Sequence, residues 1–166
     1  MTEKDSVTDK ESLLLKAKSD ALRLLSFSSR SVEELKKRLL MKKKYSVPLV
    51  EEVIESFKKQ GLLDDVKFAK LYASSRVYSR PSGRRQLEID LKRKGVSGQL
   101  IGETLKNLED YDEKKIAKEL VSTRFLKMAG LPREKKKARL YALLKRRGFG
   151  DDVIFSVFDE LFKKEE

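Results

Sequence analysis

The sequence repeats one helical pattern three times, and this repetition is the feature that most limits the possible folds. The period is about fifty residues. The clearest matching segments are residues 69–76 and 117–124, which both read A-K-x-x-[AV]-S-[ST]-R, and a weaker copy begins at Ala17. Small residues four positions apart share one helix face and let a neighbouring helix approach closely. We therefore expect each copy to open on a tightly packed helix.

A second helix is predicted after each of these segments, because two leucines recur there four positions apart. The pairs are Leu35 and Leu39, Leu87 and Leu91, and Leu140 and Leu144. A triplet of Lys and Arg follows each pair, at residues 42–44, 92–94 and 145–147. Gly95 and Gly148 come directly after the last two triplets and are expected to end their helices as C-terminal caps. The first copy has no glycine there and is slightly longer.

A third helix completes each copy, with apolar residues spaced i, i+3, i+4 and i+7 as one buried face requires. The nine helices are predicted over residues 12–28, 32–43, 48–60, 65–79, 84–94, 98–108, 113–128, 134–147 and 151–163. No alternating strand pattern of useful length is present. The predicted fold is therefore all-α.

This fold is expected to consist of three tandem three-helix repeats, over residues 12–61, 62–110 and 111–166, after a flexible leader over residues 1–11. A repeat of this size buries little surface by itself, so neighbouring repeats must supply part of its core. We expect an elongated, slightly curved array.

Acidic and hydroxyl side chains at the predicted helix starts are interpreted as caps. Ser31 is expected to cap the helix that begins at Val32, and Asp112 the helix that holds Ile116. Three pairs of adjacent acids could suggest catalytic carboxylates: Asp64-Asp65, Glu109-Asp110 and Asp151-Asp152. Because the first and last pairs stand where helices begin, capping explains them better than catalysis does.

The composition excludes several classes of function. The sequence has no Cys and no His, which excludes disulfides, thiolate metal sites and imidazole catalysis. It also has no glycine-rich phosphate loop. We therefore expect no enzymatic activity, no cofactor and no metal site. The longest unbroken apolar run is Leu13-Leu14-Leu15, and the polar N-terminus lacks the features of a signal peptide, so we expect a cytoplasmic protein, monomeric and without membrane contact.

The charge balance indicates an anionic partner. Lys and Arg total 39 against 27 acids, and the formal net charge is +12. Residues 67–94 hold nine basic and two acidic residues, and residues 133–147 hold eight and one. Acids gather instead in the third helices, so charge is segregated as well as in excess. Segregation favours a basic binding face over a merely solubilising surface, although both explanations remain open.

The predicted partner-binding or DNA-binding residues are the cations of these windows that lie near the second helices: Arg76, Arg80, Arg84, Arg85, Lys92, Arg93, Lys94, Lys145, Arg146 and Arg147. Ile89 shares the helix side of Arg85. It is either an exposed interface residue or a core contact with a neighbouring repeat. No surface row of aromatics that would stack single-stranded bases is expected, so any contact with single- or double-stranded DNA would be mainly to phosphates.

One stretch of the chain resembles the signature of the RecX family. Its elements are Leu62-Leu63-Asp64-Asp65-Val66-Lys67-Phe68-Ala69, an arginine-rich loop with Gly83, the leucines at 87 and 91, and Lys94-Gly95-Val96. The three-repeat layout agrees from about Lys16 to Phe162. The first repeat departs from the pattern, because it lacks the glycine after its second helix.

The resemblance implies a regulator of homologous recombination and DNA repair. Members of this family bind filaments of the recombinase RecA on single-stranded DNA and damp its ATPase and strand exchange, and some also touch DNA. The implied mechanism is an array that lies in the filament groove and binds the filament states with different affinities. Two alternatives remain: a stand-alone basic DNA-binding protein, and a helical scaffold for an unrelated acidic protein.

Overall fold

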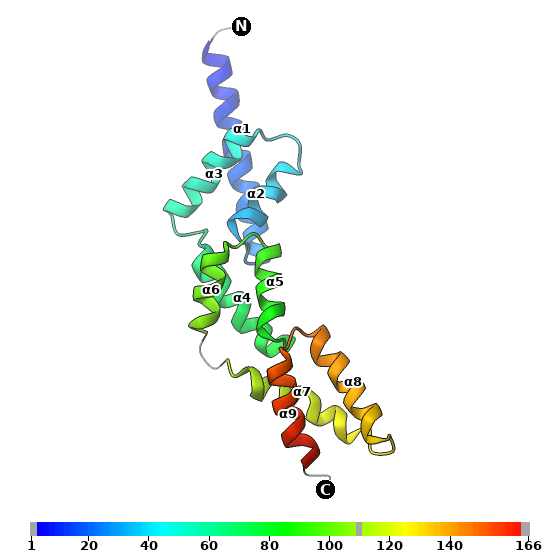
Figure 1. Ribbon diagram of the computed structural model, residues 1–166. Helices are drawn as coiled ribbons and strands as arrows, with labels where there is room; N and C mark the ends of the chain where they lie inside the picture. Colours follow the sequence, from blue (N-terminus) through cyan, green and yellow to red (C-terminus); the bar gives the residue numbers. More distant parts are fainter. Residues whose placement is uncertain (1–2, 109–110, 164–166) are drawn as a thin grey trace. The chain divides into compact units, whose positions relative to one another are not determined.

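The structure is a computed structural model that describes residues 3–108 and 111–163, and throughout these ranges it contains helices and no strands (Figure 1). The helices are α1 (Glu3–Phe27), α2 (Val32–Leu40), α3 (Val47–Lys59), α4 (Asp65–Ser79), α5 (Arg84–Arg93), α6 (Gly98–Lys106), α7 (Glu113–Leu126), α8 (Arg133–Arg146) and α9 (Asp151–Phe162). The predicted all-α fold is confirmed. The predicted pair Glu109-Asp110 lies outside the described residues.

The first helix is the main departure from the predicted boundaries. It begins at Glu3 rather than at residue 12, so the segment predicted to be a flexible leader is helical from Glu3 onward. Within residues 9–27, the first buried residue is Ala17. The preceding residues 9–13 are all exposed, so local preference rather than burial accounts for the helix there. The segment before residue 12 has no apolar periodicity, so the sequence pattern does not predict a helix there.

The chain divides into two compact units, one of residues 1–69 with 94–96 and the other of residues 70–93 with 97–166. Each unit joins parts of more than one predicted repeat. The predicted repeat boundaries at residues 61 and 110 stay a prediction.

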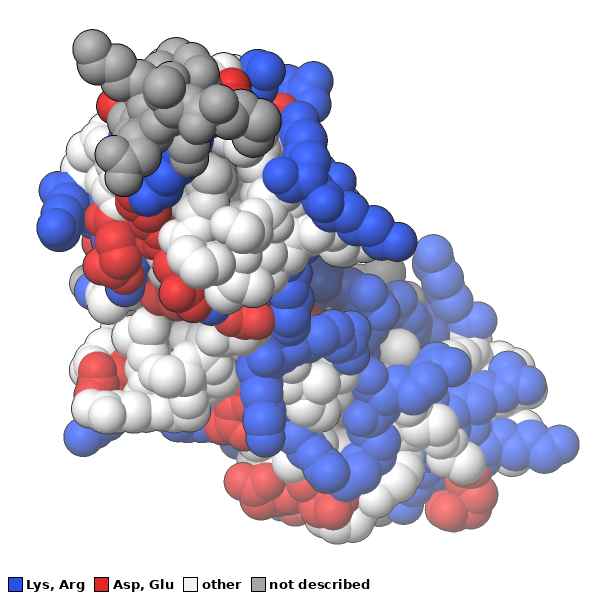
Figure 2. Space-filling model, turned by 90° about the horizontal axis from the view of Figure 1, so that it is seen from above, with Lys and Arg blue, Asp and Glu red and all other residues white. Residues whose placement is uncertain are grey.

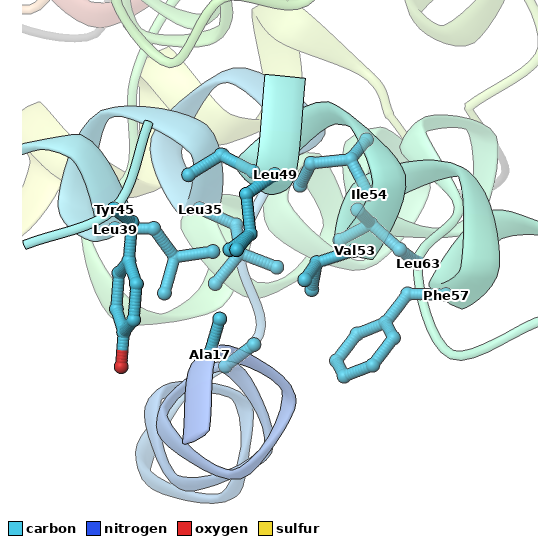
Figure 3. Packing of buried hydrophobic residues seen from close by; sticks show 11 residues of the cluster. Ala17, Leu35, Leu39, Tyr45, Leu49, Val53, Ile54, Phe57 and Leu63 are labelled. Carbon is cyan, nitrogen blue, oxygen red and sulfur yellow. The ribbon is translucent and has the colours of Figure 1, made fainter. Parts of the chain in front are cut away.

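The core of the first unit is formed by α1, α2 and α3 (Figure 3). Its fully buried members include Ala17 and Ala21 from α1, Leu35 and Leu39 from α2, and Val50 and Val53 from α3. The two alanines of α1 stand where the repeated pattern predicted small residues. The absence of longer side chains lets the other two helices pack close to α1.

The core of the second unit is built in the same way by α7, α8 and α9. Its buried side chains come from all three helices and include Ala117, Val121, Leu140, Leu144, Ile154 and Val157. Ala117 takes the position that Ala17 has in the first unit. Phe125, Phe158 and Phe162 extend this core: the Phe162 ring meets those of Phe125 and Phe158 edge to face at centroid distances of 5.2 and 5.5 Å.

Most of the predicted caps are confirmed. The Ser31 hydroxyl accepts a hydrogen bond from the Glu34 amide, and the Asp112 carboxylate accepts one from the Lys115 amide at 2.9 Å. Asp64 accepts from the amides of Val66 and Lys67 in the first turn of α4. These contacts are local caps at the starts of α2, α7 and α4.

Two of the paired acids differ from the capping interpretation. The Asp65 carboxylate accepts from the Val32 amide at 2.8 Å, so it stabilises the start of α2 instead of its own helix. Asp151 makes no side-chain cap and accepts from the Tyr141 hydroxyl at 2.9 Å and from Lys145 at 3.1 Å. Both carboxylates accept hydrogen bonds from another helix, which the position of an acid at a helix start does not reveal.

A residue in the left-handed conformation follows each second helix. Gly95 and Gly148 have φ angles of +81° and +80° there, as their predicted capping role requires. The first repeat places Lys43 in this position, with φ +55°. The chain then turns back into the core at Tyr45, Val96 and Phe149, all of which are buried.

Candidate partner-binding site

The ten predicted binding cations fall into two groups. One group has partners within the protein: Arg76, Arg84, Lys94, Lys145 and Arg147. The other consists of exposed residues whose side chains have no hydrogen bond or ion pair within the described ranges: Arg80, Arg85, Lys92, Arg93 and Arg146. Figure 2 shows broad areas of Lys and Arg on the surface and smaller groups of Asp and Glu.

Lys94 belongs to the structure of the first unit. Its ammonium lies 2.8 Å from a Glu34 carboxylate oxygen, and both side chains are about three-quarters buried. Its carbonyl oxygen accepts a hydrogen bond from the Ser31 hydroxyl. Both contacts join the end of the second basic triplet to the start of α2.

Arg147 has the corresponding role in the second unit. Its carbonyl oxygen accepts a hydrogen bond from the Gly83 amide at 2.8 Å, and its guanidinium donates to the Pro81 carbonyl oxygen at 3.1 Å. Gly83 directly precedes α5 as Ser31 directly precedes α2. The last residue of each of these two triplets therefore contacts the residue that precedes an earlier second helix.

The sequence did not predict this recurring contact of Lys94 and Arg147, because all three positions of each triplet were interpreted as surface charge. The available signal was the glycine that follows Lys94 and Arg147. A left-handed glycine turns the preceding carbonyl away from its own helix, where another segment can reach it. The first triplet is also partly structural, because Lys42 and Lys44 lie 2.8 and 3.2 Å from the Asp20 carboxylate. The Lys42 and Tyr45 hydrogen bonds hold the pKa of Asp20 well below its usual range.

Arg76 and Lys145 have partners on neighbouring helices. The Arg76 guanidinium lies 3.5 Å from the carboxylate of Asp90, which is buried in α5, and donates from Nε to the Tyr72 hydroxyl. Lys145 lies 3.1 Å from Asp151 in α9. Arg84 pairs along its own helix with Glu88 at 3.3 Å, and both side chains are about half exposed.

The exposed side of α5 forms the first candidate surface, which we call the α5 basic face. It consists of Arg85, Ile89, Lys92 and Arg93, spaced i, i+4, i+7 and i+8 along one side of the helix. Leu87 and Leu91 on the opposite side are fully buried. Ile89 is 43% exposed, so of its two interpretations the structure favours the exposed one.

A second group of cations, which we call the arginine cluster, comprises Arg76, Arg80, Arg124, Arg146 and Arg147. They come from α4 and the residue after it, from α7, and from α8 and its C-terminal cap. Partial burial, and then the charges of the four other arginines, lower the pKa of Arg147. Arg124 was not among the predicted residues. Its helix carries mixed charges, and only the folded chain brings it to the cluster.

A shallow hollow adjoins this cluster. Arg124 lines it together with Pro81 and Tyr78, and Tyr78 is 77% exposed. The acids Asp112 and Glu119 also line it. A search of the described ranges for clusters of metal-ligating side chains finds none, and none of the described helices is long and apolar enough to cross a membrane.

The fold is a repetitive helical body, and five of the ten predicted binding cations are exposed and have no hydrogen bond or ion pair within the described residues. Two family models match the chain: the first three-helix domain of RecX over residues 17–57 and the second three-helix domain of RecX over residues 64–105. The regulatory protein RecX of Streptomyces coelicolor is 31% identical over 149 residues, covering 90% of this chain and 79% of the relative. That of Pelodictyon phaeoclathratiforme is 36% identical over 129 residues, covering 78% of both.

The chain belongs to the RecX family of regulatory proteins, as its sequence signature predicted. Solved structures agree on the fold. The crystal structure of RecX from Lactobacillus salivarius superposes with a TM-score of 0.80 at 19% identity, covering 93% of this chain and 97% of that one. A second crystal structure, of regulatory protein RecX, has a TM-score of 0.83 at 22% identity and covers 96% and 80%.

Proposed function

We propose that this protein binds filaments of the recombinase RecA on single-stranded DNA and reduces their ATPase activity and strand exchange. Membership of the RecX family is the observation that carries this proposal. The protein acts by binding rather than by catalysis. A bound regulator changes the activity of a filament only if it binds one filament state more tightly than another.

The α5 basic face is the surface that we assign to this contact. Arg85, Lys92 and Arg93 are exposed and have no internal partner in the described ranges, so binding would break no existing ion pair. Ile89 adds an exposed apolar side chain among them. Cations around an apolar residue suit an acidic protein surface, because the apolar contact adds affinity while the charges orient the partner.

The test is a titration of RecA ATPase and strand exchange on single-stranded DNA with wild-type protein and with the triple variant Arg85→Ala, Lys92→Ala, Arg93→Ala. The variant should melt like the wild type, because none of the three side chains supports the core. Half-inhibition should require about tenfold more of the variant, with a shallower dependence on salt.

The matched control removes three other exposed cations without partners in the described ranges: Arg38→Ala on α2, Lys59→Ala on α3 and Lys106→Ala on α6. This variant has the same net charge as the first and should inhibit like the wild type. If both triple variants inhibit at wild-type concentrations, the α5 basic face has no part in the contact. Tight binding to protein-free DNA at physiological salt, with no effect on RecA, would instead favour the alternative of a stand-alone DNA-binding protein.

A further inference from the structure

Two members of the arginine cluster, Arg124 and Arg147, lie beside the loop that follows α4. Pro81 is the first residue after Arg80. Its carbonyl oxygen accepts a hydrogen bond from the Arg147 guanidinium at 3.1 Å, and it lines the same hollow as Arg124. Arg146 is the chain neighbour of Arg147 at the end of α8. Arg124 of α7 and Arg147 at the C-terminal cap of α8 therefore both lie beside the loop that follows Arg80.

Asp112 and Glu119 line the hollow together with Arg124, but within the described ranges neither acid forms an ion pair with an arginine of the cluster. Arg76 has a carboxylate partner, Asp90, which also accepts a hydrogen bond from Gln86 at 2.9 Å. Arg124 donates to the Leu120 carbonyl oxygen of its own helix, at 2.8 Å. Arg80 and Arg146 are exposed and unpaired within the described ranges. The cluster thus holds four guanidinium groups without a carboxylate, and mutual repulsion disfavours this arrangement unless an anion binds.

We propose that the arginine cluster binds a compact, multiply charged phosphate: a pyrophosphate or triphosphate group, either free or as the tail of a nucleotide. Guanidinium forks match the spacing of phosphate oxygens and can bind them in bidentate fashion. A triphosphate concentrates several negative charges in a small volume, which suits cations that come from several helices. A nucleic-acid strand carries one charge on each phosphate and presents them along a line, which fits a linear array of cations better.

This site is distinct from the α5 basic face and does not depend on the RecA proposal. It binds its ligand without bond cleavage. Because the C-terminal cap of α8 and the loop before α5 are joined through Arg147 and Gly83, a bound anion would also stabilise that joint. The ligand is therefore expected to raise the melting temperature of the protein.

The experiment is calorimetric titration of the full chain with sodium tripolyphosphate, pyrophosphate and orthophosphate at constant ionic strength. The test variant is Arg80→Gln with Arg146→Gln, which removes two exposed charges and leaves Arg147 in its structural contact. The matched control is Arg85→Gln with Arg93→Gln, which has the same net charge. The test variant should bind tripolyphosphate about tenfold more weakly or worse, and the control should differ by less than about twofold.

Melting temperatures show whether the variants are folded. The variant Arg124→Gln removes a single charge of the cluster and gives a second test of tripolyphosphate binding. ATP as a further ligand separates the two sources: tighter binding than tripolyphosphate assigns a nucleotide, and equal or weaker binding assigns the free anion. Equal affinity of all variants would overturn the proposal, as would no binding by wild-type protein at about 1 mM ligand. So would a test variant that loses single-stranded oligonucleotide binding while it keeps tripolyphosphate binding.

Discussion

Gly83 and Gly148 lie against each other with no room for a side chain between them. A Cβ atom on Gly83 would overlap the carbonyl group of Gly148, and one on Gly148 would lie 2.5 Å from the backbone nitrogen of Gln86. The Gly83 amide donates to the carbonyl of Arg147, next to Gly148. Gly95 has a corresponding place in the first unit, where its Cβ would overlap the side chain of Glu33. The glycines after the second helices thus serve packing as well as helix termination.

Replacing Gly148 by alanine should destabilise the protein by about 2–4 kcal/mol. The left-handed conformation costs an L-residue about 1–2 kcal/mol, and the overlap with backbone atoms of Gln86 adds a similar amount. Urea denaturation measures the change. The control is Gly102→Ala in α6, where a Cβ meets nothing within 4 Å and the residue is helical. That substitution should stabilise by about 0.5–1 kcal/mol. If the two substitutions changed the free energy of unfolding equally, the backbone around Gly148 would have room to move away from the added Cβ atom.

Replacing Lys43 by glycine should stabilise the protein by up to about 1 kcal/mol. Lys43 is exposed and has a φ of +55°, a conformation that glycine adopts without the strain of an L-residue. The greater entropy of glycine in the unfolded chain offsets part of the gain. Thermal denaturation of Lys43→Gly tests this. Lys44→Gly is the comparison, and it should destabilise because Lys44 lies 3.2 Å from Asp20. A less stable Lys43→Gly variant would contradict this account of the first repeat.

The fold could be predicted from the sequence because the three copies reinforce one another. The leucines at 35, 87 and 140 occupy equivalent buried positions, and each copy supports the interpretation of the others. The start of α1 could not be predicted, because its exposed residues 9–13 have no apolar period. Its helix rests on local preference, which is too weak a signal in one sequence.

The sequence identifies the cations of the candidate site, but it does not show which of them have partners within the folded chain. The sequence showed that cations gather around residues 76–94 and 145–147. It could not show that Lys94 reaches Glu34, because that pair is separated by sixty residues and forms only when the chain folds. Likewise Arg124 joins the arginine cluster from a helix with mixed charge. Sequence spacing identifies which residues share a helix face, whereas tertiary packing decides which of those faces has a partner.

The carboxylate of Glu160 should titrate at an unusually low pH. It lies 2.6 Å from the ammonium groups of both Lys114 and Lys118, and hydrogen bonds from these two lysines lower its pKa from 4.5 to about 2. The stabilisation from this contact is fully present above the unfolded pKa near 4.5. It is lost as the pH falls toward about 2, because the unfolded chain then binds the proton more readily.

An NMR titration of the Glu160 side-chain carboxyl carbon measures this pKa. In the variant Lys114→Gln with Lys118→Gln the midpoint should return to near 4.5, and acid unfolding should depend less on pH in this range. An unchanged midpoint in that variant would mean that the two lysines do not lower the pKa of Glu160 in solution.

Substitutions at Leu87 and Ile89, two residues of α5, should affect stability and partner binding separately. Leu87 is fully buried, so Leu87→Ala should destabilise the protein by about 2–5 kcal/mol through lost burial and the cavity left behind. Ile89 is 43% exposed, so Ile89→Ala should cost less than about 1 kcal/mol. The melting temperature should fall only for the first variant. At a temperature where both remain folded, RecA inhibition should weaken only for the second, since only Ile89 belongs to the α5 basic face. If inhibition weakened for folded Leu87→Ala and stayed at the wild-type level for Ile89→Ala, the contact would lie elsewhere on the protein.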